Sequence, residues 1–160
     1  HTKTELVFVG LSTKWATEAE AKDKAQENGR NQLVKYYGTL ITAQGRTAKA
    51  TYGISSDVFA PQQVSQELEE YVAKSLSKKL AAYSFYVESY LTKDMEESHI
   101  AYALMKIDKS DANKAMEEYC DDKADDARKK AAAEKDAERK KQLEKAADFF
   151  GGQLKSSLTE

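Results

Sequence analysis

Two apolar segments in the middle of the chain, residues 83–90 and 100–107, show a two-residue alternation. A period of two is typical of a half-buried strand, because successive side chains leave opposite faces of the pleat. Residues 92–98, between the two segments, are polar and charged apart from Met95, which is typical of a solvated hairpin loop. The pattern predicts an antiparallel pair of strands, and we place this pair at the centre of the fold.

A strand and a helix are predicted at the start of the chain. Residues 5–10, ELVFVG, form a short apolar run that is typical of a buried strand. Thr17 and Glu20 have the spacing of a capping box, so we expect a helix to begin there. We expect Gly38 to end this helix, because glycine is common directly after a helix C-terminus.

A second strand and a second helix are expected next. Residues 39–52 are rich in threonine and alternate, which predicts an extended strand or a hairpin interrupted near Gly45. Pro61 suits the first turn of a helix, because backbone N–H groups there make no intrahelical hydrogen bond and proline has no N–H. Apolar residues then recur at helical spacing over residues 64–80, and we expect this helix to end about Ala82.

The C-terminal third has a different composition from the rest of the chain. Ser110 can cap a third helix, whose apolar stripe comprises Ala112, Ala115, Met116 and Tyr119. From residue 121 to 141 the apolar residues are almost all alanine, and oppositely charged residues four apart favour a helix that buries nothing. We therefore predict two parts. Residues 4–120 form an α+β domain with an antiparallel sheet backed by helices, and residues 121–160 form a long, charged helical extension with an apolar end.

The end of this extension carries the predicted interaction site. Its residues are Leu143, Phe149, Phe150 and Leu154. Large apolar side chains beyond a solvated spacer need a partner, and the sequence leaves open whether that partner is the protein's own core, another copy or a different protein. We expect the extension to act as an oligomerisation or docking arm for a protein partner or for self-association.

Charge and hydropathy limit the other partners. Lys and Arg number 25 against 27 Asp and Glu, so the chain has no overall basic field and we expect no nucleic-acid partner. No apolar run approaches the roughly 20 residues of a membrane span. We expect contact with a membrane only through an N-terminal lipid anchor, which would lie upstream of His1 together with any signal peptide.

No catalytic constellation is evident, and we expect no enzyme activity, no cofactor and no metal. His99 lies in or beside the hairpin loop, where we expect it to be solvated, and no serine has the setting of a nucleophile elbow. Cys120 is flanked by acids that raise a thiol pKa, so we expect it to be passive. Four aspartates at helical spacing lack the glycine turn and closing glutamate of a calcium loop, and we interpret them as a solvated helix face. They are Asp121, Asp122, Asp125 and Asp126.

The order of these motifs resembles a known family. The chain resembles the small bacterial outer-membrane lipoproteins of the Lpp-twenty type in the order of five segments. They are VFVGLS, the helix AEAKDKAQENGRNQLVKYYG, the strand TLITA, a helix with V-x-x-x-L spacing, and HIAYALMKIDKSDANKAMEEY. Relatives of that family include the flagellar lipoprotein FlgP and the N-terminal domain of FlgT. The resemblance covers residues 6–119, and its strongest part is AYALMKIDK. It implies a dodecin-like sheet backed by helices, in the order βαβ-α-ββ-α, and export to the periplasm or outer membrane.

The resemblance supplies no catalytic residues and implies a non-enzymatic role in a bacterial cell-envelope or flagellum-associated assembly. The lipobox cysteine of a lipoprotein is absent from this sequence, and the charged segment from Asp121 onward differs from the short ending of the family. We therefore expect a structural or protein-interaction module. The alternative is a periplasmic small-ligand carrier with a pocket between the sheet and the helices, near Tyr71, Tyr83 or Tyr102.

Overall fold

The computed structural model describes residues 4–159, and these residues form two compact units. Unit 1 contains the described residues up to Lys35 together with Val72–Asp111, and unit 2 contains Tyr36–Tyr71 and the residues from Ala112 onward. The boundaries between the units fall inside helices α1 (Glu18–Tyr52), α2 (Pro61–Ser75) and α3 (Lys109–Ala133). Each unit is described separately below.

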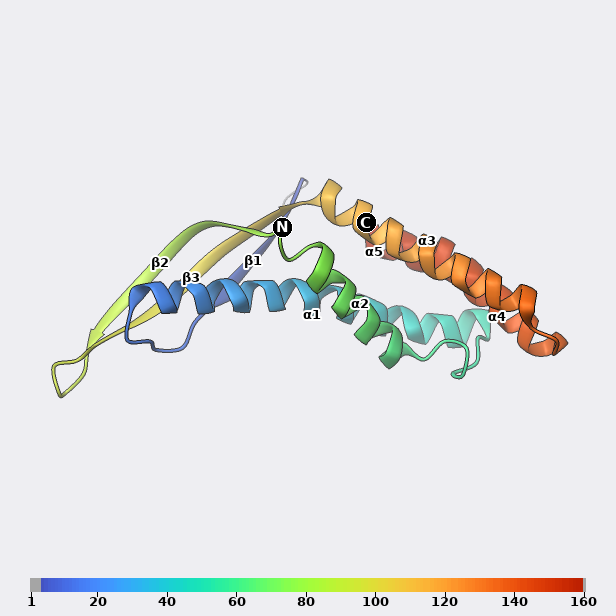
Figure 1. The fold of residues 1–160 in the computed structure, drawn as a ribbon, viewed down its shortest axis with the longest axis horizontal. Helices are drawn as coiled ribbons and strands as arrows, with labels where there is room; N and C mark the ends of the chain where they lie inside the picture. Colours follow the sequence, from blue (N-terminus) through green and yellow to red (C-terminus); the bar gives the residue numbers. More distant parts are fainter. Residues whose placement is uncertain (1–3, 160) are drawn as a thin grey trace. The chain divides into compact units, whose positions relative to one another are not determined.

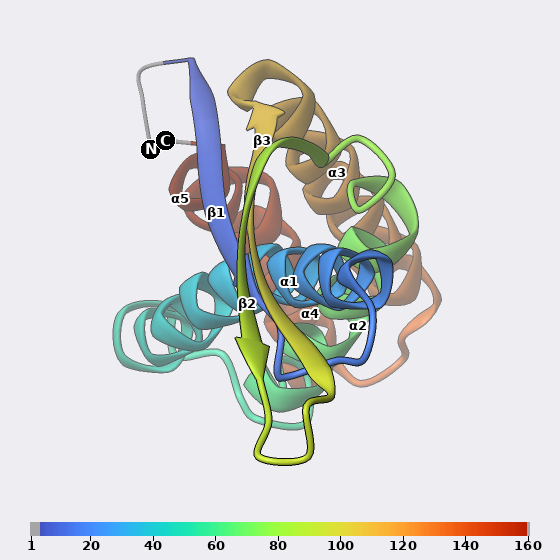
Figure 2. The same ribbon diagram turned by 90° about the vertical axis from the view of Figure 1, so that its left-hand side faces the viewer.

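Unit 1 is built on a three-stranded antiparallel sheet of β1 (Glu5–Leu11), β2 (Ala81–Leu91) and β3 (Glu97–Asp108), in the order β1-β3-β2 (Figures 1 and 2). The predicted hairpin is confirmed, because β2 and β3 are joined by the polar turn at residues 92–96. The strand predicted at residues 5–10 is also confirmed as β1. The mixed α and β character of the chain follows the sequence prediction.

The first part of α1 lies on one face of this sheet, which we call the inner face (Figure 1). A Cβ on Gly10 of β1 would come within 1.8 Å of the Ala25 carbonyl oxygen, and a Cβ on Gly29 within 2.7 Å of Met105 on β3. The helix therefore approaches the backbone of β1 directly and meets β3 at the Met105 side chain. The inner face comprises Leu6, Phe8, Gly10, Ala101, Ala103, Met105 and Ile107.

The beginning of α1 agrees with the sequence prediction. The backbone N–H of Glu20 donates to Thr17 Oγ1 at 3.2 Å, and the Thr17 hydroxyl donates to the Glu20 carboxylate at 2.8 Å. The helix then continues to Tyr52, so the predicted stop at Gly38 and the predicted strand at residues 39–52 are wrong.

Packing within unit 2 explains this difference. Tyr37, Ile41, Gly45 and Ala48 are buried at spacings of a helix and not of a strand. A Cβ on Gly38 would lie 2.8 Å from the Glu69 carboxylate, and one on Gly45 would lie 2.8 Å from the Pro61 ring. These glycines let α1 approach α2 closely, and this tertiary contact outweighs the low helix propensity of threonine and glycine.

The second helix begins at Pro61 as predicted, but it ends at Ser75 and not near Ala82. The reason is that Ala81 and Ala82 already pair with Lys106 and Met105 of β3 as the first residues of β2. The observed order is therefore β-α-α-β-β-α, and the dodecin-like order βαβ-α-ββ-α is not found.

The C-terminal segment does not form one continuous helix. The helix α3 ends at Ala133 and is followed by α4 (Ala137–Phe149), the π-helix η1 (Phe150–Leu154) and α5 (Lys155–Thr159). Asp136 caps α4 by accepting a hydrogen bond from the Arg139 N–H at 2.8 Å. The extension is helical, and this capped break lets the chain reverse direction.

The returning segment packs along α3 within unit 2. Lys155 on α5 pairs with Asp121 at 2.9 Å, and Asn113 donates to the Thr159 carbonyl at 2.7 Å. The alanines of α3 that we expected to remain exposed are buried. They are Ala124, Ala127 and Ala131, and a Cβ on Gly151 would lie 3.7 Å from the Ala124 methyl. Small side chains at this spacing allow close helix packing.

Substituting Gly10 tests the backbone contact on the inner face. We expect Gly10→Ala to lower the free energy of unfolding by about 3 kcal/mol or more, because its methyl would overlap a backbone carbonyl that no rotamer change can move. The matched control is Gly152→Ala, which meets no atom within 4 Å and sits in a helical segment. We expect it to leave stability unchanged or to raise it by up to about 1 kcal/mol. Urea unfolding of both variants measures the difference, and equal stability would contradict the contact.

Candidate functional site

The opposite face of the sheet in unit 1 carries apolar side chains that remain exposed. We call it the outer face, and it includes Val9, Leu11, Tyr86, Tyr102 and Leu104. Cross-strand pairing brings these side chains together, because Val9 lies opposite Leu104, and Leu11 and Tyr86 both lie opposite Tyr102. Val9 is 57% exposed and Tyr86 is 62% exposed. A contiguous apolar surface of this kind is typical of an interaction site.

Strand β2 is exposed on both of its faces. Phe85 points to the inner face and Tyr86 to the outer face, yet both are exposed, as are Tyr83, Tyr90 and Leu91. The cause is the position of α1, which lies against Gly10 of β1 and Met105 of β3. It reaches β2 with the long side chain of Lys22, whose ammonium lies 5.6 Å from the ring centre of Phe85. In the part of the chain that the structure describes, β2 forms one edge of the sheet.

This edge has few of the features that protect edge strands from pairing with other chains. Lysines, prolines and bulges usually serve that purpose. The sequence of β2, AAYSFYVESYL, contains one charged residue, Glu88, and no proline. A register shift between Ala82 and Ser84 leaves Tyr83 without a partner on β3, so the regular part of the edge is residues 84–91.

Polar neighbours surround the aromatic side chains of β2. The ammonium groups of Lys106 and Lys14 lie 4.0 Å and 5.0 Å from the ring centres of Tyr83 and Tyr90. The Tyr90 hydroxyl donates a hydrogen bond to the Glu88 carboxylate, and this bond raises the pKa of Tyr90. The edge is therefore amphipathic, which is typical of surfaces that bind protein.

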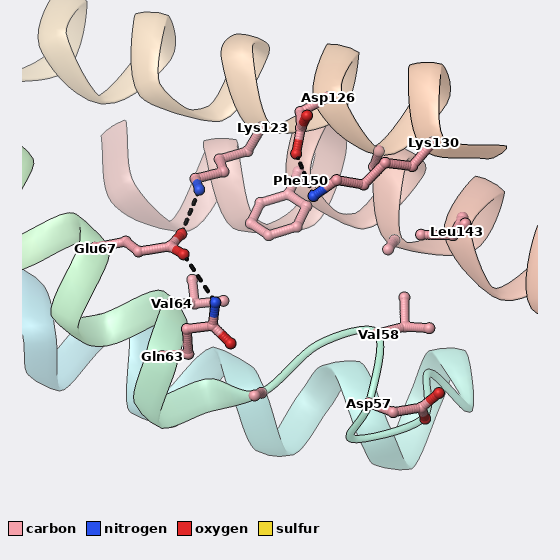
Figure 3. Close-up of a pocket in the computed structure, with 13 residues that line it drawn as sticks. Asp57, Val58, Gln63, Val64, Glu67, Lys123, Asp126, Lys130, Leu143 and Phe150 are labelled. Atoms are coloured by element: carbon pink, nitrogen blue, oxygen red, sulfur yellow. Dashed lines mark hydrogen bonds and ion pairs between the residues drawn. The ribbon is translucent and has the colours of Figure 1, made fainter. Parts of the chain in front are cut away.

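A small polar cavity lies within unit 2, lined by residues of α2, α3 and α4 (Figure 3). Two ion pairs lie beside it on its solvent side: Lys123 of α3 with Glu67 of α2, and Lys130 with Asp126 within α3, the second at 2.7 Å. The hydrogen bond from Lys130 lowers the pKa of Asp126. The cavity volume is about 110 Å³. Ligand pockets are usually about 300–1,000 Å³, so this cavity suits a few water molecules better than a metabolite.

His99 is not a solvated loop residue, contrary to the sequence prediction. It lies in β3, is 9% exposed, and its Nδ1 is 2.9 Å from the Ser89 hydroxyl on β2. Its backbone exchanges hydrogen bonds with Trp15, which pins the segment after β1 to the sheet. These contacts account for its burial, and they place it in the structure of the sheet.

The predicted interaction residues lie in the core of unit 2. Phe149, Phe150 and Leu154 are buried, and Leu143 lines the cavity of Figure 3. The Phe149 and Phe150 rings lie 5.3 and 5.5 Å from the ring of Phe59. The sequence left three partners open for these side chains, and in the structure they pack against the protein's own core. The predicted C-terminal docking surface is therefore corrected, because the helical reversal turns these side chains inward.

The tyrosines considered for a small-ligand pocket do not gather in one place. Tyr83 and Tyr102 lie on the exposed sheet of unit 1, whereas Tyr71 packs 5.3 Å from Tyr119 in unit 2. A depression of about 440 Å³ in unit 2 is lined by residues that include Arg46 and Lys49, and none of these tyrosines lines it. A second hollow, of about 300 Å³, lies in unit 1 and is lined by residues that include Tyr83, Lys79 and Lys106. The three tyrosines therefore share no pocket, and a ligand site beside Tyr83 stays a prediction.

The sequence analysis missed the outer face and the β2 edge as a site. The signal was present in the hairpin, because β2 has aromatic residues at odd and even positions: Tyr83, Phe85, Tyr86 and Tyr90. A strand with one buried face has its large apolar residues on that face only. The sequence does not show where α1 lies, and both faces of β2 are exposed because of the position of that helix.

Cys120 offers a test of the packing of unit 2. Its side chain is buried, and burial with the nearby Asp121 raises the pKa of the thiol from 9.0 to about 12. At pH 8 about one thiol in ten thousand is then ionised in the folded protein, so we expect almost no reaction with Ellman's reagent. Stability from this shift is complete below pH 9 and is lost as the pH rises toward 12, because the folded state holds the proton more tightly. Labelling at the same rate in buffer and in urea would contradict this burial.

Searches for other sites and for relatives give negative results. Within residues 4–159, no group of three or more His, Cys, Asp or Glu residues could hold a metal ion. No helix among the same residues is long and apolar enough to cross a membrane. Comparison of the chain with protein-family models, with curated proteins and with solved structures found no match.

Proposed function

We propose that this protein is a non-enzymatic protein-interaction module of the bacterial cell envelope, and that the sheet of unit 1 is its contact surface. The observation that carries the proposal is the exposure of large apolar side chains on the outer face and along β2. Tyr86 is 62% exposed and Val9 is 57% exposed on one surface, and a partner that covers them lowers the free energy by removing apolar area from water.

The charge of the surface supports a protein partner. The outer face contains apolar and aromatic side chains over most of its length. Of its charged residues, Glu5 and Lys106 pair with each other at 3.3 Å at one end, beside Asp108, and Glu88 accepts a hydrogen bond from the Tyr90 hydroxyl. A nucleic-acid surface requires a row of unpaired basic groups beside the aromatic rings. An apolar centre with a paired, polar margin is instead the composition of protein interfaces.

The contact surface in this proposal differs from the C-terminal arm predicted from the sequence. Phe149, Phe150 and Leu154 are covered within unit 2, so their burial stabilises the fold and leaves no apolar surface for a partner. The envelope location, and a flagellum- or surface-associated assembly as its setting, are supported by the sequence resemblance to the lipoprotein family. A lipid anchor upstream of His1 belongs to the same proposal.

Site-specific photo-crosslinking in the bacterium that produces the protein tests this function. Benzoylphenylalanine at Tyr86 or at Val9 is expected to give discrete covalent adducts on irradiation, because both side chains point outward from the proposed surface. The matched control is Lys141, an exposed position on α4 in unit 2. Adducts at Lys141 but none at Tyr86 or Val9 would contradict the proposal, as would the absence of adducts at all three positions.

A further inference from the structure

We propose that β2 pairs with β2 of a second copy of this chain, antiparallel and about a two-fold axis at Val87, so that two three-stranded sheets become one of six strands. This inference rests on the proposed function and names the partner at the β2 edge, whereas the outer face around Val9 on β1 stays open to a further protein. The regular edge at residues 84–91 has no neighbour among the described strands, and its backbone groups on that side can bond to another strand.

Exposure on both faces favours a strand as the occupant. A partner lying on the outer face would cover Tyr86 but would leave Phe85 exposed on the inner side. A strand added at the edge places its own side chains beside both. A second copy supplies such a strand, because β2 itself carries apolar residues on both faces.

The sequence of β2 selects one register among the symmetric ones. A two-fold axis normal to the sheet keeps the outer face of both copies on the same side. Residues directly opposite each other then point to the same face only if the axis passes through a residue and not between two residues. An axis at Tyr86 pairs only residues 84–88 of the regular edge, whereas an axis at Val87 pairs residues 84–90. An axis at Glu88 is disfavoured because it sets two carboxylates directly opposite each other.

The register centred at Val87 has favourable pairs along its whole length. It sets Tyr86 of one copy opposite Glu88 of the other, so that a phenol hydroxyl meets a carboxylate twice. Phe85 then lies opposite Ser89 and diagonal to Val87 of the partner, and Ser84 lies opposite Tyr90. The diagonal contact of Phe85 with Val87 is an aromatic pair with a β-branched residue, which stabilises antiparallel strands.

The exposed apolar area of β2 allows an estimate of how tightly the two copies associate. An aromatic residue buries roughly 150–250 Å², and the three aromatic residues of the regular edge are between 38% and 62% exposed. With Leu91, each copy offers on the order of 400 Å², so the dimer buries about 800 Å² in total. This is below the usual range of stable interfaces, so a weak, reversible dimer is expected.

Analytical ultracentrifugation of the full chain, from about 1 to 500 µM, tests the pairing. The unmodified protein is expected to change from monomer to dimer over this range. Tyr86→Glu sets a carboxylate opposite Glu88 and is expected to weaken the dimer at least about ten-fold. Tyr86→Lys sets an ammonium opposite Glu88 and is expected to keep or strengthen it. The double variant Tyr86→Glu with Glu88→Lys is expected to restore it.

Lys141→Glu is the matched control, because Lys141 is exposed on α4 in unit 2 and belongs neither to β2 nor to the outer face. It is expected to leave the dimer unchanged. Circular dichroism confirms that each variant is folded. A monomer at every concentration would overturn the inference, and so would equal effects of Glu and Lys at position 86. Because the proposed function requires a protein adduct at Tyr86 or Val9 and no particular partner, a monomeric chain crosslinked to a different protein would overturn this inference alone.

Discussion

The contact between Gly10 of β1 and the backbone of α1 determines what unit 1 covers and what it exposes. Because neither Gly10 nor Gly29 has a side chain, the helix lies directly against β1 and β3. Three strands spaced about 4.8 Å apart are about as wide as one helix with its side chains, roughly 10–12 Å. A helix placed over β1 and β3 therefore leaves β2 largely exposed. The exposure of Phe85 on the inner side of β2 is a consequence of this placement.

Unit 2, in contrast to the sheet of unit 1, buries its large apolar residues. The capped break at Asp136 lets α4, η1 and α5 return along α3, and the alanines of α3 allow this approach without large side chains between the helices. The aromatic residues at the end of α4 then fill the space around Phe59. A segment that is highly charged in sequence thus has a buried stripe, with its ion pairs on the solvent side. Lys130 with Asp126 and Arg128 with Asp125 are examples.

The sequence predicted those features that depend on neighbouring residues. The hairpin, β1, the Thr17–Glu20 cap and the start of α2 at Pro61 follow from local patterns and are present in the structure. The continuation of α1 past Gly38 depends on the fit of glycine against Glu69 and Pro61, which no local pattern contains. The reversal after Ala133 turns an apparent docking arm into a core. The outer face and the β2 edge could not be predicted from the sequence, because their exposure depends on which part of the sheet α1 leaves uncovered.

Residue-resolved amide hydrogen exchange at low and high protein concentration tests the account most directly. If α1 covers the sheet on one side and β2 is an edge for association, amides of β3 exchange slowly at both concentrations. The amides of β2 that point away from β3 then exchange rapidly in dilute solution and slowly in concentrated solution. Protection of β2 that is the same at both concentrations, whether high or low, would contradict the account.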